Sequence, residues 1–403
     1  MKICMLIRRH SFLDARVFEK EARSLARMGH HVTIMAPKHK GQLISLARTP
    51  VTDKAFQKGR FINEGVHFVP YQANQIKGKQ IERMKKIMVQ NIVKRSQTYF
   101  VDSLCTMALR ERADVYYAHE WETLYEAVQI KRMLKKQNSH VKVIFDAHEL
   151  EEHNTLLKVL MREVDHIITV SDSLKSIYSS RYPKIPITVI YNSPHFHEQE
   201  RPIEKYESLA SADKPFTIAY EGRLSINKGD PYKILEIVNL LNRSSMKVKF
   251  MILGTVALTN KLEMNKIIKK LRSHPQIHYG WVDYKDLHQF WTMVDVGYIY
   301  FNLNDLNRVY ALPNKFFSFL NSGIPVVVNA APEMESFINK YQCGIIIKKK
   351  NPTAADYAAY FASLSKNREL LSRLSINARE IMRTTFCWER MEERLAGVMK
   401  LMK

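Results

Sequence analysis

Apolar runs alternate with helical patterns along most of the chain. The runs are rich in Val, Ile and Tyr and are continuous, which is typical of strands covered on both faces of a parallel sheet. In the first half of the chain they lie at residues 2–7, 31–37, 67–71, 114–119, 142–148, 166–171 and 187–192. In the second half they lie at residues 216–222, 249–254, 277–281, 296–301, 325–330 and 344–348. Because helical patterns separate the runs, the chain predicts βαβ units of the α/β class, arranged in doubly wound sheets.

A polar stretch interrupts this alternation between Ser193 and Lys214. It contains proline and shows no clean period, so we interpret residues 196–213 as a linker. A chain of 403 residues is also too long for one ordinary core, which favours two domains. We therefore expect an N-terminal domain over residues 1–195 and a C-terminal domain over 214–385. Ligands of such sheets bind at the carboxyl ends of the strands, here in a cleft between the two domains.

Residues 216–229 combine a buried strand, a loop with two cations and the start of a helix. Gly222 ends the strand, Arg223 and Lys228 follow, and a helical pattern begins after Gly229. A helix N-terminus offers free N–H groups, arginine can hold phosphate bidentately, and lysine adds a point charge. The segment therefore indicates a diphosphate pocket. A surface loop with two solvated cations is the alternative that fits the same residues.

Three predicted strands of the N-terminal half end in polar residues that could carry chemistry. These residues are Asp14 and Arg16 after the run 2–7, His119 and Glu120 at the end of the run 114–119, and His148 and Glu149 at the end of the run 142–148. A histidine there can act as an acid, a base or a dipolar stabiliser. Two similar strand ends favour a functional role for His148, and less so for His119. The alternatives are structural hydrogen bonds for the histidines and, for Asp14, an interaction with the helix dipole.

A second candidate segment lies in the C-terminal half. Residues 314–322 predict a short helix that ends at Gly323 and precedes a buried strand. Asn314, Lys315 and Ser318 are the polar positions at its start, whereas its aromatic and leucine side chains indicate core packing. We expect these three residues to face the cleft.

The composition adds an anionic partner to this picture. With 46% hydrophobic and 25% charged residues the chain is globular, but its net charge of +22 implies nucleic acid, phospholipid headgroups or an anionic substrate. Its four cysteines are scattered without metal-ligand spacing, so neither a zinc site nor a disulfide framework is indicated. No apolar run approaches the roughly 20 residues that cross a bilayer, and the N-terminal run is too short for a signal peptide. We expect a cytoplasmic protein.

Residues 77–95 predict a basic amphipathic helix. Apolar residues recur at helical spacing between Ile81 and Ile92, and Lys and Arg occupy many of the other positions. Such a helix can lie on an anionic membrane surface from the inside of the cell, or it can pack on the core with a solvated charged face. Nucleic acid would use the same charges, but it is unlikely as a partner because the chain contains no helix-turn-helix, RNP-like run or zinc module.

Several motifs together resemble the family 4 glycosyltransferases. The residues Asp14-Ala15-Arg16 with EARSLARMGHHVTIMAP resemble the N-terminal signature of that family. YEGRLSINKG resembles its donor-diphosphate segment, LPNKFFSFLNSGIPVVV its nucleotide-binding helix, and VDHIITVSDSLKSIY and VIYNSP also fit. The resemblance runs from about residue 2 to Trp388, and the combination of motifs is more specific than any one of them.

The resemblance implies the GT-B fold, in which two Rossmann-like domains face each other with a nucleotide-sugar between them. It also implies that the helix over residues 386–403 packs back on the N-terminal domain. Arg223 and Lys228, with Gly222, would neutralise the donor diphosphate, with Asn314, Lys315 and Ser318 near the nucleoside. His148 would lie beside the transferring sugar, Asp14 and Arg16 near donor and acceptor, and His119, Glu120 and Glu149 on the acceptor side. The family usually retains anomeric configuration and needs neither a bound metal nor a cofactor, and the chain has no DxD-type site.

The chain departs from the family pattern at two positions. The family usually carries two glutamates eight positions apart, and these positions are Tyr310 and Ser318 here. The second glutamate normally holds the ribose hydroxyls, so Ser318 implies altered donor binding or a non-catalytic copy. Glu333 and Glu335, past the next strand, are candidate substitutes.

The expected function is the transfer of a sugar from a nucleotide-diphosphate-sugar to a glycan or lipid-linked acceptor in bacterial cell-surface polysaccharide or glycolipid synthesis. The protein would work in the cytoplasm or peripherally at the inner face of the membrane. A catalytically degenerate binding or scaffold subunit is the main alternative. A different GT-B enzyme such as a nucleotide-sugar epimerase, and a nucleic-acid binder, are the others.

Overall fold

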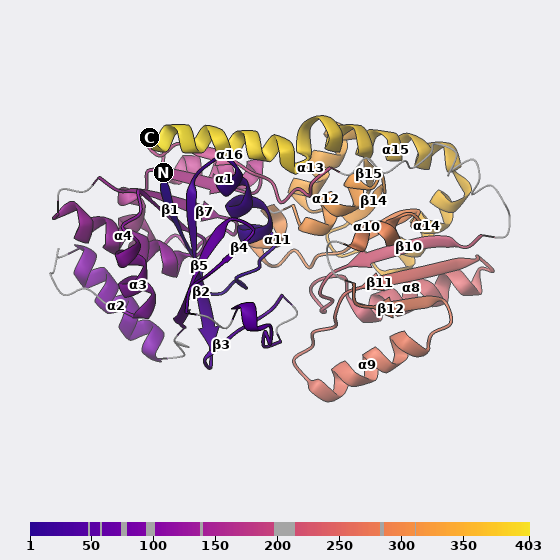
Figure 1. The fold of residues 1–403 in the computed structure, drawn as a ribbon. Helices are drawn as coiled ribbons and strands as arrows, with labels where there is room; N and C mark the ends of the chain where they lie inside the picture. The colour runs from indigo at the N-terminus through magenta and orange to yellow at the C-terminus, as the bar shows by residue number, and fades with distance from the viewer. Residues whose placement is uncertain are drawn as a thin grey trace. The chain divides into compact units, whose positions relative to one another are not determined.

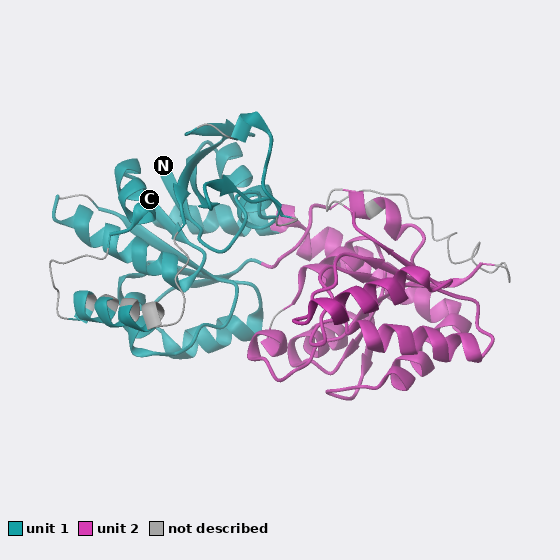
Figure 2. Cartoon of the chain, turned by 90° about the horizontal axis from the view of Figure 1, so that it is seen from below, with its two compact units in different colours: residues 1–190, 391–403 teal, residues 191–390 magenta. Residues whose placement is uncertain are grey.

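Two separate parallel sheets organise the chain. The computed structural model describes residues 1–46, 49–56, 59–73, 79–93, 101–137, 140–196, 214–282, 286–310 and 312–403. These residues form an N-terminal unit of residues 1–190 with 391–403 and a C-terminal unit of residues 191–390, coloured separately in Figure 2. The boundary lies before Tyr191 rather than after residue 195, because the Tyr191 ring packs on Phe317 and Phe386 of the C-terminal unit, with ring centroids 5.7 and 5.1 Å apart. Apart from Phe196, the predicted linker 196–213 lies outside the described residues.

The N-terminal unit is built on a sheet of nine strands within the described residues (Figure 1). Their spatial order is β4-β5-β2-β1-β6-β7-β8-β9, with β3 paired to β2. The strands are β1 (Lys2–Leu6), β2 (His31–His39), β3 (Gln42–Leu43), β4 (Phe61–Asn63), β5 (Val66–Gln72), β6 (Val115–Ala118), β7 (Lys142–Ala147), β8 (His166–Thr169) and β9 (Ile187–Val189). All ladders are parallel except β2–β3 and β4–β5. Of these two hairpins, β3 and β4 lie outside the predicted runs, because they are too short to show a pattern.

Helices cover this sheet in the order that the alternating pattern predicts. They are η1 (Val17–Ala22), α1 (Arg23–Arg27), η2 (Lys54–Phe56), α2 (Lys79–Val93), α3 (Ser103–Glu111), α4 (Trp121–Lys135), α5 (Thr155–Leu160), η3 (Met161–Glu163) and α6 (Asp172–Arg181). The last helix of the chain, α16 (Trp388–Met402), belongs to this unit from Met391 onward. Glu392 of α16 pairs with Arg27 at 2.8 Å, and Arg394 donates to the carbonyl oxygen of Val189 at 2.9 Å.

The C-terminal unit is built on a fully parallel sheet in the order β12-β11-β10-β13-β14-β15. Its strands are β10 (Phe216–Glu221), β11 (Val248–Leu253), β12 (Ile277–Gly280), β13 (Val296–Ile299), β14 (Val326–Asn329) and β15 (Gly344–Ile347). Its helices are α8 (Pro231–Arg243), α9 (Lys261–Ser273), α10 (Leu287–Trp291), α11 (Leu306–Tyr310), α12 (Asn314–Asn321), α13 (Pro332–Tyr341), α14 (Ala354–Lys366), α15 (Arg368–Ile381) and η5 (Met382–Phe386). The rings of Tyr298, Tyr357 and Phe361 pack together in its core.

Each sheet has one strand at which the order of connection reverses. In the N-terminal unit this strand is β1, between β2 and β6, and in the C-terminal unit it is β10, between β11 and β13. Ligands of open α/β sheets bind outside the carboxyl ends of the strands at such a switch point. The residues that follow β1 and β10 are therefore the first place to look for a site in each unit.

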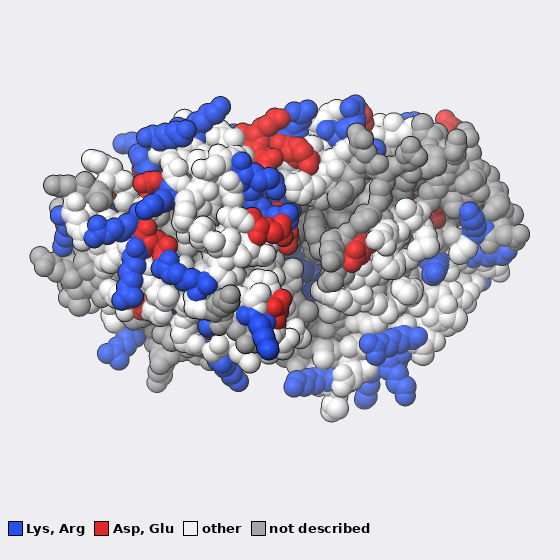
Figure 3. Space-filling view, viewed as in Figure 1, with Lys and Arg blue, Asp and Glu red and all other residues white. Residues whose placement is uncertain are grey.

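The predicted basic helix is present as α2, which packs against α5. Arg83 and Lys86 on it are exposed, whereas residues 77, 78, 94 and 95 and the side chains of Ile81 and Ile92 lie outside the described part of the chain. In Figure 3, Lys and Arg side chains of the described residues are spread over several elements of the visible face. Membrane contact through α2 stays a prediction. No helix among the described residues has the length and apolar character needed to cross a bilayer.

Candidate active site

A buried carboxylate organises the site of the N-terminal unit. Asp146, at the end of β7, is fully buried and accepts hydrogen bonds from Arg16 Nε at 2.9 Å and Arg16 Nη2 at 2.8 Å. His119 Nδ1 and His148 Nδ1 lie 3.1 and 3.2 Å from its Oδ2 atom. Burial alone raises the pKa of Asp146, but the Arg16 guanidinium and the bonds to the two imidazoles outweigh it and hold the pKa well below the usual range. Asp146 is therefore a permanent anion that orients three side chains.

Arg16 has a structural position. Its side chain is buried, and besides Asp146 it contacts Glu21 at 3.1 Å and donates to the carbonyl oxygen of Ile190 at 3.0 Å. These partners occupy the guanidinium, so Arg16 supports Asp146 rather than facing a substrate. The sequence analysis places Arg16 near donor and acceptor, and this position stays a prediction.

His148 extends the hydrogen-bonded network of Asp146 toward the surface. Because Nδ1 of His148 donates to the Asp146 carboxylate, the proton of His148 lies on Nδ1. The Nε2 atom of His148 lies 3.1 Å from Nε2 of His10. The other ring nitrogen of His10 is 3.3 Å from Asp14 Oδ2. Burial alone lowers the pKa of His10, but the hydrogen bond to Asp14 and the charge of Glu120 outweigh it and raise the pKa to about 9. His10 is then an imidazolium that donates to both Asp14 and His148.

The result is a continuous chain, Asp14–His10–His148–Asp146, defined here as the histidine chain. The bond to His10 lowers the pKa of Asp14, although burial opposes this effect. The outer end of the histidine chain, formed by His10 and Asp14, opens into a cavity of about 490 Å³. That cavity is lined by Arg9, His10, Ser11, Asp14, Pro37, His39, Ile44, Ser45 and Leu46. The histidine chain can share protons between a buried anion and this cavity. The sequence analysis assigns no role to His10, although its place just after the switch strand β1 marks it as a strand-end residue.

His119 and Glu120 are held inside the structure. His119 is buried, stacks on Tyr117 with ring centroids 4.7 Å apart, and has its pKa lowered by burial, so it is a neutral partner of Asp146. Glu120 accepts from the backbone N–H groups of Arg8 and Arg9 at 3.2 and 2.9 Å and precedes α4. These contacts agree with the structural alternative for both residues. Glu149 is exposed at the start of the segment after β7.

Three of these residues have the spacing of a metal site. The ligand atoms of His119, Asp146 and His148 lie within 4.8 Å of one another. A divalent cation bound there would share Asp146 with Arg16, whose charge is permanent and whose two nitrogens already occupy both carboxylate oxygens. The donor set therefore favours shared hydrogen bonds over a metal ion.

The loop after β10 forms a candidate site of its own in the C-terminal unit. Gly222 has φ +96°, and a Cβ atom on Gly254, at the end of β11, would lie 1.9 Å from the Gly222 carbonyl oxygen. Ser225 and Lys228 exchange two backbone hydrogen bonds of 2.9 Å, and the hydroxyl of Tyr298 donates to the Gly229 carbonyl oxygen at 3.0 Å. This backbone holds Arg223 and Lys228 at the exposed surface of the loop.

Lys315 brings another cation to the same loop. Its buried Nζ atom lies 3.9 Å above the Tyr220 ring, and 3.7 Å from where a Cβ atom on Gly222 would be. Burial lowers the pKa of Lys315, Glu221 opposes this effect, and the charge of Lys228 adds to it, so that the net pKa is about 7. Lys315 is therefore half protonated near neutral pH and close enough to Lys228 to sense its charge. The structure thus places Lys315 beside Gly222 and within range of the charge of Lys228, and the roles of these residues in donor binding stay a prediction.

The remaining residues of α12 are placed differently. Asn314 is exposed at the first position of the helix, whereas Ser318 is buried and accepts a hydrogen bond from Trp291 Nε1 at 3.2 Å. The hydroxyl of Ser318 is thus used inside the unit. Of the two candidate substitutes in the first turn of α13, Glu333 is buried and Glu335 is half-buried.

Comparisons with known proteins agree with this arrangement. Glycosyltransferase Family 4 matches residues 15–193, and Glycosyl transferases group 1 matches residues 203–381. An uncharacterised glycosyltransferase of Methanocaldococcus jannaschii is 26% identical over 258 residues, and this match spans 60% of the present chain and 64% of the relative's length.

Solved structures share the fold over nearly the whole chain. HepE of Anabaena, determined in complex with UDP, superposes with a TM-score of 0.67 at 13% identity and covers 99% of this chain and 100% of its own. Sucrose-phosphate synthase of Thermosynechococcus elongatus superposes with a TM-score of 0.65 at 12% identity, and the match covers 99% of this chain and 98% of the synthase. A glycosyltransferase of Rickettsia africae superposes with a TM-score of 0.65 at 14% identity, and the match covers 100% of this chain and 98% of that protein. The two Rossmann-like sheets therefore have the GT-B fold, and the chain belongs to the family 4 glycosyltransferases.

Proposed function

We propose that the protein transfers a sugar from a nucleotide-diphosphate-sugar to a glycan or lipid-linked acceptor, with retention of anomeric configuration and without a metal or other cofactor. The observation that carries the proposal is the position of Lys315 beside Gly222 and within range of the charge of Lys228, at the switch point of the C-terminal sheet. Nearby Arg223 adds a guanidinium on the same loop. The nucleotide-sugar is further supported by HepE, which was determined in complex with UDP-glucose.

In this reaction the bond between the sugar and the diphosphate breaks, and negative charge develops on the leaving phosphate oxygen. Cations already fixed at that oxygen favour the transition state over the ground state, because their positions need no rearrangement. Arg223, Lys228 and Lys315 would fill this role. His148 would lie beside the transferring sugar, and the histidine chain would hold its ring orientation and the proton on its Nδ1 atom.

The biological setting is part of the proposal. The acceptor would belong to bacterial cell-surface polysaccharide or glycolipid synthesis, with α2 resting on the anionic inner face of the membrane. Retention on anionic liposomes but not on DNA at the same salt concentration would support this setting. The opposite preference would contradict it.

Calorimetric titration with a panel of UDP-, GDP- and other nucleotide-sugars tests the donor. We expect Arg223→Ala and Lys228→Ala each to weaken donor binding by about ten-fold or more, the usual loss for a charge-assisted hydrogen bond. Arg243→Ala is the matched control, since Arg243 is an exposed cation at the far end of α8. Near-normal sugar transfer by either loop variant would refute the assignment of the diphosphate site.

One observation favours a second candidate function. Ser318 stands where the family usually has a ribose-binding glutamate, and its hydroxyl is bonded to Trp291. A protein with this departure could be a binding or scaffold subunit without transferase activity. In that case no member of the nucleotide-sugar panel would bind. Turnover of a donor without any acceptor would instead indicate an epimerase-type enzyme.

A further inference from the structure

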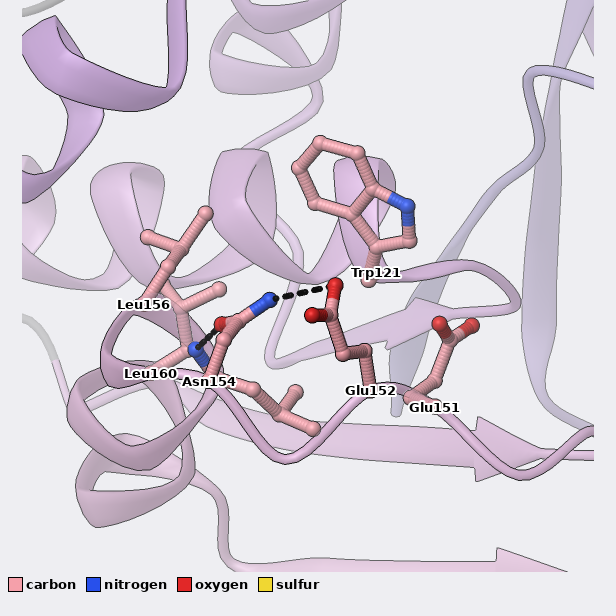
Figure 4. A pocket seen from close by; sticks show the side chains of 7 residues that line it. Trp121, Glu151, Glu152, Asn154, Leu156 and Leu160 are labelled. Carbon is pink, nitrogen blue, oxygen red and sulfur yellow. Dashed lines mark hydrogen bonds between the residues drawn. The ribbon is translucent and has the colours of Figure 1, made fainter. Parts of the chain in front are cut away.

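A smaller cavity lies beside the segment that follows His148. It measures about 120 Å³ and is lined by Trp121, Glu151, Glu152, Asn154 and leucines of α5. In Figure 4 the indole of Trp121 lies on one side, and the side chains of Glu152 and Asn154 lie across from it. We propose that this cavity binds one sugar ring of the acceptor that carries no negative charge, with the ring stacked on Trp121 and its hydroxyls bonded to Glu151 and Glu152. The inference rests on the proposed function, because it takes the acceptor to be a glycan.

The apolar side of the cavity suits the carbon face of a pyranose. Trp121 is the first residue of α4 and is partly exposed, so its ring can be covered by a ligand. Leu156, Leu157 and Leu160 are buried and form an apolar wall. A sugar ring has a face of C–H groups and a rim of hydroxyls, and an aromatic ring with an apolar wall buries that face.

The polar side of the cavity is fixed and offers acceptors. Asn154 Oδ1 accepts from the Leu157 N–H at 2.9 Å, which caps α5, and its Nδ2 atom donates to Glu152 Oε2 at 3.4 Å. The second carboxylate oxygen of Glu152 has no hydrogen-bond partner among the described residues. Ionised carboxylates only accept hydrogen bonds, so they match the hydroxyl donors of a sugar.

Charge decides which sugars fit. Burial raises the pKa of Glu151 to about 7, and the neighbouring carboxylates of Glu122 and Glu149 contribute, while Arg9 and His148 oppose. Although this raised pKa reduces the charge of Glu151, two carboxyl groups, those of Glu151 and Glu152, line the cavity of a chain whose net charge is +22. A sugar phosphate or uronic acid would be repelled there. Glu151 follows His148 by three residues in the segment after β7, so the cavity lies on the same segment as one member of the histidine chain.

The experiment uses the full chain and simple probes. Methyl α-D-glucopyranoside and N-acetylglucosamine are the neutral probes, and glucuronate and glucose 6-phosphate the anionic ones. Tryptophan emission is followed in the Trp281→Phe variant, because Trp281 is 53% exposed and would also respond to solvent. The remaining tryptophans are then the partly exposed Trp121 and the buried Trp291 and Trp388. We expect a neutral probe to change the emission in a saturable way and the anionic probes to leave it unchanged.

Saturation-transfer NMR on variants then locates the binding. Trp121→Ala should weaken the neutral probe by about ten-fold or more, Trp121→Phe should weaken it less, and Glu152→Gln should weaken it without changing the fold. Circular dichroism and donor affinity, both expected to be unchanged, exclude misfolding. Equal binding of neutral and anionic probes, unchanged binding by Trp121→Ala, or no binding of either neutral probe would overturn the inference. If the neutral probe binds and no nucleotide-sugar does, the proposed function fails while the sugar site stands.

Discussion

Lys315 should couple donor binding to pH. Its buried Nζ atom lies over the Tyr220 ring, and the pKa near 7 means that a large share of the free protein lacks this proton at neutral pH. A bound diphosphate would place negative charge beside Nζ and favour the charged form. The protein should therefore take up a proton at Lys315 when the donor binds above pH 7.

The size of the effect follows from the pKa. Below pH 7 Lys315 is already charged, and donor affinity should change little. Above pH 7 each further pH unit should raise the dissociation constant by about ten-fold, or about 1.4 kcal/mol, because the proton must be regained from a more dilute pool. Lys315→Met should bind the donor weakly at every pH and should lose this dependence.

Calorimetry between pH 6.5 and 8.5, in buffers of different ionisation enthalpy, measures both affinity and proton uptake. Nucleotide-diphosphate-sugars suit this range, since their phosphodiester groups do not titrate in it. Lys233→Met is the matched control, because Lys233 Nζ also lies over a tyrosine ring, 3.8 Å from the Tyr300 centroid, but bonds to the Pro352 carbonyl oxygen. A dissociation constant that stays constant across this range, or an equal pH dependence in Lys315→Met, would refute the reasoning.

The same lysine affects stability with a definite sign. The folded state disfavours charged Lys315, so the penalty is fully present below pH 7 and is relieved as the pH rises from about 7 toward 10.5. Without donor, Lys315→Met should therefore unfold at higher urea concentration than the natural protein at pH 7. This difference should shrink at pH 9.

Three further outcomes are expected. A histidine with a raised pKa stabilises the fold fully below pH 6.5 and loses that contribution as the pH rises through about 9. His10→Gln should therefore lose less stability between pH 6.5 and 9 than the natural protein does. Urea titrations at both pH values check this, and an equal loss of stability in the two proteins would contradict it. Asp146→Asn should cost about 3–5 kcal/mol in urea unfolding, because Arg16 stays buried without its anion, and a cost below about 1 kcal/mol would show that Arg16 relaxes to other partners. Gly254→Ala should displace the Gly222 peptide and reduce donor affinity while circular dichroism is unchanged, and normal affinity would mean that the loop adapts.

The sequence predicts the strands and helices better than it predicts which side chains contact one another. Continuous apolar runs identify β7 and β10, and because ligands bind at the carboxyl ends of strands, the same pattern points to His148 after β7 and to Lys228 after β10. Short antiparallel strands such as β4 carry too few residues to show a pattern.

Partners depend on strand order, which no local pattern contains. Arg16 follows β1 and Asp146 ends β7, and they meet across the intervening strand β6, so the buried pairing of Arg16 with Asp146 is not visible in the sequence. His10 is a histidine in a polar loop until β1 and β7 bring it to His148. The chemistry of this site therefore depends on residues that only the strand order brings together.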